Sequence, residues 1–403
     1  MPEQFPERIT QDTKIIFSVE RFGLYAIWVA ARCQSAKQSE FGVNETLRLE
    51  IDDLKFREIP PLDKPQYNKI PPAWNGADQQ GLTKTVVFII ALNKGEHSLH
   101  FFPTNEVLIE KWSCHLIENS QEIIFDLGKQ AEDGDKRPWY TFAFIKTPLV
   151  SIDAKISVNW HFLDGDDVKL IIDGKVQENT SSKFWRYWLW SARPWQVLSG
   201  PKNEQKKLNS GLPQDVHYVE FWIDKTPTLH RIVFNLGDFQ PKRIPTVNDP
   251  KWTGNFVDDT DQMILARALF GEVRNTLIPD VARHAIGWVI KNRVISKNWP
   301  NTYWEVITKP SQFSAFNVSD DNRQFVENPL YTGKKIDKLA WKHAYEIAGK
   351  LIKNEIPDPT NGANHYYDDS INTPDWAKDN KPTLTVTYSN QYDREANIFF
   401  FDL

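Results

Sequence analysis

The spacing of apolar residues changes once along this chain, and that change limits the folds open to it. Over about the first 240 residues, short apolar runs such as KIIFSV, TVVFIIAL and KISVNWHF recur between turn residues. Several alternate with a period of two and are rich in Val, Ile, Phe, Tyr and Trp, as β-strands are. From residue 260 the spacing becomes helical, before two final strand-like runs, TLTVTY and NIFFFD. The sequence therefore predicts a β-rich part followed by a mainly α part with a small sheet.

The β-rich part contains an internal repeat. Residues 47–52 (LRLEID) resemble residues 168–173 (VKLIID), which begin 121 positions later. Residues 96–101 (EHSLHF) resemble residues 216–221 (VHYVEF), which begin 120 positions later. Since two separate segments share nearly the same offset, the sequence predicts two copies of one β-domain, as jelly-roll-like β-sandwiches.

A Pro-rich stretch without periodicity, QPKRIPTVNDPKWTGNFVD, follows the second copy and is typical of a linker. The chain is therefore expected to have four parts. These are β-sandwich modules at residues 1–120 and 121–240, a linker at residues 241–258, and a mainly α domain at residues 259–403.

Composition excludes some classes of protein. The net charge is −5 and the pI is about 6.0, so no basic field points to nucleic acid. No apolar run is long enough to span a membrane. The opening residues, MPEQFPERITQDTK, lack a basic segment followed by an apolar one, so no signal peptide is predicted. Cys33 and Cys114 are too few for a disulfide framework, and they form either one bridge between neighbouring strands or two free thiols.

A carboxylate ends an apolar face of the predicted helix over residues 260–274. That face is formed by Leu265, Ala268, Leu269 and Glu272, which share helical spacing. Burial at this position would disfavour the charged form of Glu272 and raise its pKa, as a general acid requires. Gly271, which has no side chain, would let a bulky substrate approach. The alternative is a salt bridge from Glu272 to Arg267 or Arg274.

Three later segments offer polar groups among aromatic ones. Aromatic rings stack on the C–H faces of sugars, while amides and hydroxyls bind sugar hydroxyl groups. Each segment taken alone also fits ordinary packing. For Asn292 the alternative is a structural amide. The candidate substrate-binding residues are Asn292, Gln312, Phe313, Ser314, His365, Tyr366 and Tyr367.

Taken in order, ARALFGEVR, IGWVIKNRV, KPSQFSAF, GANHYY and TPDWA resemble the SleB/CwlJ-type cell wall hydrolases, which include spore-cortex-lytic enzymes. The resemblance covers residues 260–403. It implies a lysozyme-like α fold with a small β subdomain, acting on the muramic acid–glucosamine bond of peptidoglycan as a lytic transglycosylase or muramidase. It also implies that Glu272 is the catalytic glutamate, that Gln312 and Ser314 belong to the family's QFS motif, and that His365 is the family histidine.

The chain departs from the family pattern at several positions. The family's GEAR reads GEVR here, its GATHFY reads GANHYY, and Phe316 replaces the tryptophan that often ends QFSAW. The terminal His-x-Phe-Tyr pattern reads Asn397-Ile398-Phe399-Phe400, so any supporting role of that histidine is lost. Glu272 is retained, and activity is expected.

The carboxylates available favour one reaction type. Ordinary glycoside hydrolysis uses two carboxylates that flank the bond. The recognised motifs offer Glu272 alone, with Asp368 and Asp369 as the alternative source of a second acid. A single acid/base favours internal attack by the muramic acid 6-hydroxyl, which forms a 1,6-anhydro sugar. A lytic transglycosylase is therefore favoured over a muramidase.

The two repeats loosely resemble carbohydrate-binding β-sandwich modules. A cluster of tryptophans in the second repeat is the candidate glycan-binding surface, and the alternative is that these rings fill the core. The cluster consists of Trp185, Trp188, Trp190 and Trp195. We expect peptidoglycan strands as the partner and no cofactor or metal. The chain would act outside the cell or in the wall, or stay in the cytoplasm if it is not exported.

Two other functions remain open. The first is a zinc amidase, because His284, His343 and His365 supply three imidazoles, although no tight ligand spacing such as H-E-x-x-H occurs. The second is a glycan-binding protein whose catalytic fold has lost its activity, which the missing terminal histidine favours.

Overall fold

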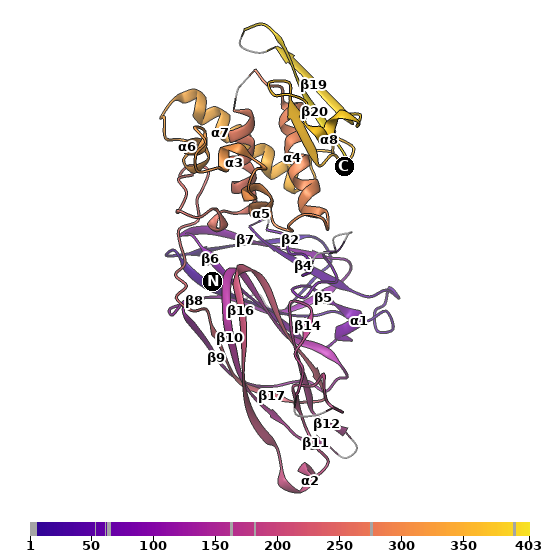
Figure 1. The fold of residues 1–403 in the computed structure, drawn as a ribbon. Helices are drawn as coiled ribbons and strands as arrows, with labels where there is room; N and C mark the ends of the chain where they lie inside the picture. The colour runs from indigo at the N-terminus through magenta and orange to yellow at the C-terminus, as the bar shows by residue number, and fades with distance from the viewer. Residues whose placement is uncertain are drawn as a thin grey trace. The chain divides into compact units, whose positions relative to one another are not determined.

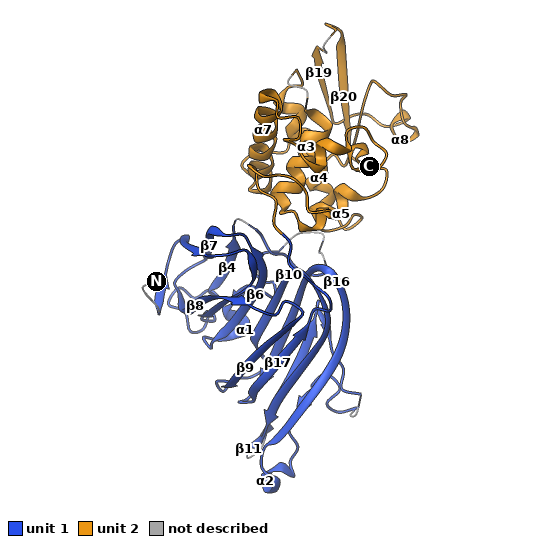
Figure 2. Cartoon of the chain, turned by 90° about the vertical axis from the view of Figure 1, so that its left-hand side faces the viewer, with its two compact units in different colours: residues 1–242 blue, residues 243–403 orange. Residues whose placement is uncertain are grey.

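The computed structural model describes residues 6–52, 54–60, 62, 66–161, 164–180, 183–274, 277–389 and 392–403. It divides into two compact units, residues 1–242 and residues 243–403, which Figures 1 and 2 show. Unit 1 is built of strands with two one-turn helices, and unit 2 is mainly helical with a small sheet. The prediction of a mostly β chain with a helical C-terminal region is confirmed.

Unit 1 contains seventeen strands among the residues that the structure describes. They are β1 (Glu7–Ile9), β2 (Thr13–Val19), β3 (Gly23–Arg32), β4 (Thr46–Ile51), β5 (Trp74–Asn75), β6 (Lys84–Leu92), β7 (Gly95–Pro103), β8 (Val107–Ile117), β9 (Glu122–Gln130), β10 (Arg137–Val158), β11 (Trp160–His161), β12 (Asp164–Gly165), β13 (Asp167–Ile172), β14 (Lys175–Val176), β15 (Trp190–Ser191), β16 (Lys202–Asp224) and β17 (Thr228–Asn235). The short helices are α1 (Gly76–Gln79) and α2 (Gln196–Ser199).

An 11-stranded sheet runs through unit 1 in the order β1-β8-β3-β6-β10-β16-β13-β14, and β17 pairs with both β10 and β9. A second sheet has the order β2-β7-β4-β5. β6 pairs in parallel with β10, from Thr85 opposite Tyr140 to Ile89 opposite Phe144. The pairing of strands is therefore continuous across the predicted module boundary near residue 120.

The segments that suggested a repeat make matching hydrogen bonds. His97 Nδ1 lies 2.6 Å from Asp52 Oδ2, and His217 Nδ1 lies 2.8 Å from Asp173 Oδ2. In each pair the other ring nitrogen contacts a backbone carbonyl four residues earlier, and the aspartate has a left-handed φ, of 49° and 45°. These correspondences support two copies of one domain. The division into two β-sandwich modules stays a prediction.

Unit 2 contains helices and a three-stranded sheet of order β18-β20-β19. The helical elements are η1 (Phe256–Asp258), α3 (Asp261–Val273), α4 (Asp280–Ile295), α5 (Tyr303–Thr308), η2 (Ser314–Phe316), α6 (Arg323–Glu327), α7 (Lys335–Ile352) and α8 (Asp375–Lys378). The strands are β18 (His365–Asp368), β19 (Leu384–Ser389) and β20 (Glu395–Phe401). Thr260 caps α3 by accepting a hydrogen bond from Met263 N, so the helix that carries Glu272 begins at a defined residue.

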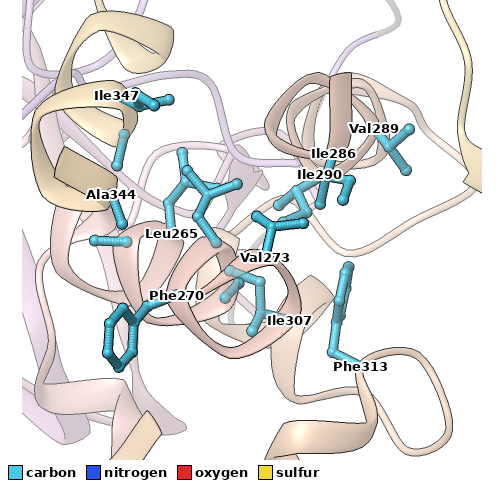
Figure 3. Packing of buried hydrophobic residues seen from close by; sticks show 14 of the residues in the cluster. Leu265, Phe270, Val273, Ile286, Val289, Ile290, Ile307, Phe313, Ala344 and Ile347 are labelled. Carbon is cyan, nitrogen blue, oxygen red and sulfur yellow. The ribbon is translucent and has the colours of Figure 1, made fainter. Parts of the chain in front are cut away.

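One apolar core holds α3, α4 and α7 together, as Figure 3 shows. Leu265 and Val273 of α3 lie in it with Ile290 of α4 and Ile347 of α7. Gly287 lets α4 approach α7, because a Cβ at this position would lie 2.2 Å from Leu351 Cδ1. The packing fixes the end of α3, where Glu272 lies.

The stretch predicted as a linker is partly packed against unit 2. Residues from Arg243 on belong to unit 2. Trp341 Nε1 donates to Val247 O at 2.8 Å, and the fully buried Arg267 donates to Pro250 O at 2.6 Å and to Asp259. From Val247 on, this stretch is therefore tied to the helical core.

Two further features bear on the expectations from sequence. Cys33 is buried and Cys114 half-buried, and both are free thiols. Burial raises the pKa of Cys114 to about 12, so this thiol stays protonated at neutral pH. Among the described residues, no helix has both the length and the apolar character needed to cross a membrane.

Candidate active site

Glu272 lies in the last turn of α3 with its carboxylate largely buried. Tyr366 Oη donates a hydrogen bond to Glu272 Oε2 at 2.9 Å. Burial raises the pKa of Glu272 to about 7, the Tyr366 hydrogen bond opposes this shift, and the charges of Asp320 and Asp368 add to it. A carboxyl group with this pKa is present in both protonation states near neutral pH, as acid/base chemistry requires.

Tyr366 is positioned by the small sheet. It lies on β18 opposite Phe400 of β20, and the two rings stack with centroids 5.9 Å apart. Burial and the nearby Glu272 raise the pKa of Tyr366 well above its usual value, so its hydroxyl keeps its proton and acts as a donor. The pair therefore joins the end of α3 to a strand almost a hundred residues later.

Arg293 of α4 connects the two candidate loops. Its Nε donates to Asn364 O at 2.6 Å, and its Nη1 donates to Gln312 Oε1 at 3.1 Å. The guanidinium carbon lies 4.3 Å from the centre of the Trp299 ring. Burial lowers the pKa of Arg293 to about 10, which leaves it charged at neutral pH. Since Gln312 Oε1 accepts from Arg293, Gln312 would meet a substrate through its Nε2 hydrogens.

Asn292 has a structural role. Its Nδ2 donates to Asp358 Oδ2 at 3.1 Å and to Ala363 O at 2.9 Å. Both amide hydrogens hold the loop that leads into β18. This matches the structural amide that the sequence left open, and Asn292 orders the loop before Tyr366.

His365 and Tyr367 lie beside aromatic rings on β18. The His365 ring lies 6.0 Å from Trp299 and 5.2 Å from Trp376, measured between centroids, and its Nδ1 lies 2.6 Å from Asn364 Oδ1. Burial lowers the pKa of His365, so its imidazole is neutral at pH 7. Tyr367 also packs edge-on against Trp376, at 5.8 Å. Both side chains remain half-exposed, as a sugar-binding role requires.

Two predictions are wrong. Phe313 is 1% exposed and packs in the helical core, so it cannot contact a substrate (Figure 3). Gly271 does not open a path for a ligand, because a Cβ there would lie 2.8 Å from Val326 and 3.0 Å from Ala315. The glycine instead lets α3 pack closely. Ser314 is exposed at the start of η2 and stays available as a candidate.

The two arginines proposed as salt-bridge partners of Glu272 are engaged elsewhere. Arg267 Nε donates to Asp259 at 2.7 Å inside the core. The Arg274 guanidinium carbon lies 3.3 Å from the centre of the Phe325 ring. The observed partner of Glu272 is a phenol, which holds the carboxyl group without adding a positive charge.

Residues 279–392 match the family described as Cell Wall Hydrolase. The resemblance predicted for the C-terminal third is thereby confirmed for this region. Glu272 precedes the matched residues by seven positions. A spore cortex-lytic enzyme from Bacillus cereus is 30% identical over 185 residues, which is 45% of this chain. The match spans 61% of that relative's length.

Two solved structures are also similar to the cell wall hydrolase region. The catalytic domain of the Bacillus cereus SleB protein is 25% identical, with a TM-score of 0.24, and the match covers 35% of this chain and 89% of that one. The catalytic domain of a germination-specific lytic transglycosylase, SleB from Bacillus anthracis, is also 25% identical, with a TM-score of 0.23. That second match covers 35% of this chain and 93% of the other.

Asn397 stands where the resemblance led us to expect a terminal histidine. Asn397 donates to Asp369 Oδ2 through its backbone N at 2.8 Å and its Nδ2 at 3.0 Å. Asp369 is thus held by β20. Asp368 is exposed and accepts from Ser370 N at 2.9 Å.

The three histidines considered for zinc are not gathered into one site. His343 contacts Asp280 at 2.8 Å, while His365 of β18 lies beside the rings of Trp299 and Trp376. Across the described ranges, no group of three or more His, Cys, Asp and Glu side chains is arranged to hold a metal ion.

The tryptophan cluster of unit 1 is not one surface. Trp190 does not fit the prediction, because it is fully buried and its Nε1 donates to Glu204 O at 3.1 Å. Arg193 lies 3.7 Å above the Trp185 ring, and Lys169 lies 4.9 Å above the Trp188 ring. Trp195 is 66% exposed.

Proposed function

We propose that this chain degrades peptidoglycan, using Glu272 as the single acid/base, and that it acts at the cell wall. The observation that carries the proposal is the Glu272–Tyr366 pair, in which a largely buried carboxyl with a pKa of about 7 is held by a neutral donor. The match of residues 279–392 to cell wall hydrolases supports the substrate class.

The reaction we propose is cleavage of the muramic acid–glucosamine bond. Protonated Glu272 gives its proton to the glycosidic oxygen as the bond to the anomeric carbon breaks. The resulting carboxylate then takes the proton of the muramic acid 6-hydroxyl, whose oxygen bonds to the anomeric carbon. The product is a 1,6-anhydro sugar, and Glu272 is protonated again.

The role of Tyr366 follows from its hydrogen bond. The donor stabilises the charged carboxylate that exists between the two proton transfers, because a hydrogen bond to an ionised acceptor is stronger than one to a neutral acceptor. Arg293 keeps the Gln312 loop and the Asn364 backbone together at the same site. Half-exposed His365 and Tyr367, together with Gln312 and Ser314, would contact the sugar.

The arrangement of carboxylates favours the transglycosylase over the muramidase. Hydrolysis needs a second carboxylate that activates water or attacks the sugar. Asp369 is held by two hydrogen bonds from Asn397, and Asp368 is exposed beside Ser370. Asp368 is the last residue of β18 and Asp369 follows the strand, whereas Glu272 bonds to Tyr366 within it.

Mass spectrometry of digested glycan tests the reaction type. We expect 1,6-anhydro-muramyl ends, which are lighter by one water than reducing ends. The matched controls are Glu272→Gln, which should release neither product, and Glu346→Gln, the same change at an exposed position of α7, which should release the parent's products. Reducing ends alone would contradict the transglycosylase assignment and point to Asp368 or Asp369.

A further inference from the structure

Unit 1 contains an open groove of about 730 Å³ between the face of β8, β3 and β6 and the strand β9. We propose that this groove binds a glycan strand of the cell wall, apart from the catalytic site. The choice of glycan class rests on the proposed function, whereas the existence of a ligand site rests on unit 1 alone. Its volume lies within the roughly 300–1,000 Å³ of ordinary ligand pockets.

Strand register explains why the groove is hollow. Ala26, Trp28 and Ala30 alternate along β3 and line the groove, while the residues between them are buried in the opposite core. One large ring therefore stands between two methyl groups, of which Ala26 is buried, while Trp28 and Ala30 are half-buried. On the neighbouring strand β8, Ser113 pairs with Trp28 and His115 pairs with Ala26.

The Trp28 ring is held in place by other aromatic rings. Phe125 of β9 meets it edge to face at 4.9 Å, and Phe142 of β10 does so at 6.4 Å, between ring centroids. Tyr140, which also lines the groove, stacks with Phe142 at 6.0 Å. A ring fixed before binding loses little conformational freedom when a ligand stacks on it.

Polar groups along the groove suit a sugar. Ser113 Oγ and His115 Nε2 lie 3.0 Å apart, and both side chains line the groove beside Lys111. Hydroxyl, imidazole and ammonium groups bind sugar hydroxyls and acetamide carbonyls, while the indole binds C–H faces. Glu122 and Asp126 lie on the same groove, so its charge is mixed. This mixture disfavours a polyanion such as nucleic acid.

The lining comes from both predicted copies of the β-domain. Trp28 and Ser113 belong to residues 1–120, whereas Phe125 and Tyr140 belong to residues 121–240. The site is therefore complete only where the two halves meet. By contrast, the tryptophans singled out from sequence have three different surroundings. Trp190 is buried, and cations cover Trp185 and Trp188. Trp195 is exposed and has no aromatic neighbour among the described residues.

The test uses the full chain carrying Glu272→Gln, so that the polymer stays intact during measurement. Ser113→Trp fills the groove without removing a core ring, and Trp28→Ala removes the stacking surface. The matched control is Phe41→Ala, an exposed aromatic residue of unit 1 outside both the groove and the tryptophan cluster. Binding is measured by co-sedimentation with purified, protease-treated sacculi and by titration with a hexamer of N-acetylglucosamine, with thermal unfolding checked for every variant.

We expect Ser113→Trp and Trp28→Ala to weaken binding about tenfold or more and Phe41→Ala to leave it unchanged. Parent-like binding by a folded Ser113→Trp variant, or no binding by the parent chain to either probe, would overturn the proposal.

Failure of the proposed function is distinguishable from failure of the groove. With Glu272 restored, groove variants should cleave short soluble glycan fragments at the parent's rate. If the parent cleaves nothing while the groove variants still lose binding, the catalytic proposal fails and the groove stands.

Discussion

The two units each contain a carboxyl group whose pKa is raised, and comparing the two shows what a raised pKa means. In unit 1, burial raises the pKa of Asp167 to about 8, and Asp224, its partner across β13 and β16, adds to the shift. In unit 2, burial raises the pKa of Glu272 to about 7. The larger shift therefore belongs to Asp167, which is not part of the candidate active site.

The difference lies in what holds each group. Glu272 accepts a hydrogen bond from Tyr366, a neutral donor that stabilises the charged form when it is needed. The Asp167 carboxyl also has a neutral partner, Ser191, whose hydrogen bond opposes the rise in pKa, while Asp167 Oδ1 and Asp224 Oδ1 are buried atoms with no hydrogen-bond partner among the described residues. A raised pKa by itself therefore records burial, and the groups gathered around the carboxyl, such as Tyr366, Arg293 and His365 near Glu272, are what indicate chemistry.

The largest effect should come from Glu272→Gln, which removes the titrating proton and keeps the shape. We expect cleavage of purified peptidoglycan to fall by about 10²- to 10⁴-fold or more. Asp167→Asn, the equivalent change at the other raised carboxyl, should leave the rate on short soluble fragments within about twofold. Equal losses of cleavage rate in Glu272→Gln and Asp167→Asn, measured by the release of soluble muropeptides, would contradict the distinction drawn between the two carboxyl groups.

A smaller effect is expected from Tyr366→Phe. The rate should fall by about 10- to 150-fold, since a hydrogen bond to a charged group contributes roughly 1.5–3 kcal/mol. In the parent, activity should decline as pH rises through about 7, because Glu272 must be protonated to act as an acid. The Tyr366 hydrogen bond favours the charged carboxylate, so its loss raises the pKa of Glu272 further.

The pH profile of Tyr366→Phe therefore distinguishes a positioning role from a structural one. Its declining limb should move to higher pH than in the parent. Tyr367→Phe is the matched control, and its limb should stay in place. A rate loss in Tyr366→Phe with an unmoved limb would show that the hydroxyl only supports the fold.

The smallest effect concerns stability. A carboxyl with a folded pKa above its unfolded pKa takes up a proton on folding, so its contribution falls as pH rises from the unfolded to the folded value. For Asp167 this window runs from about 4 to about 8, and for Glu272 from about 4.5 to about 7. Each amide variant should therefore gain thermal stability relative to the parent across its own window and keep that gain at higher pH.

Unfolding curves measured from pH 4 to pH 9 check this expectation. The gain of Asp167→Asn should continue to rise between pH 7 and pH 8, where that of Glu272→Gln is already level. Parallel curves for parent and variants over the whole range would show that folding raises the pKa of neither carboxyl.

The catalytic candidate could be predicted from sequence, but its partner could not. Helical spacing placed Glu272 at the end of an apolar face, and α3 does end there. Tyr366 was expected to bind substrate, and it bonds Glu272 because β18 pairs with β20. The role of Arg293 depends on two partners, Asn364 and Gln312, which lie in loops that no local pattern connects.

The wrong predictions have a common cause. Phe313 and Gly271 were interpreted from their neighbours in sequence, as an aromatic ring beside polar groups and as a gap beside a glutamate. Both are turned into the packing between α3 and its neighbours, against Ala315 and Val326 in the case of Gly271. A sequence motif shows which residue types are close along the chain and does not show which way each side chain points.

The sequence by itself determined the change from strands to helices, the resemblance between segments about 120 residues apart, and the position of Glu272 on its helix. Each depends on side chains a few positions apart, whose periodicity follows from backbone geometry. Only the tertiary structure decided that Tyr366 meets Glu272 and that Trp28 faces a groove beside Phe125. Burial, pKa and pocket shape depend on contacts between segments far apart in sequence, and no local pattern specifies those contacts.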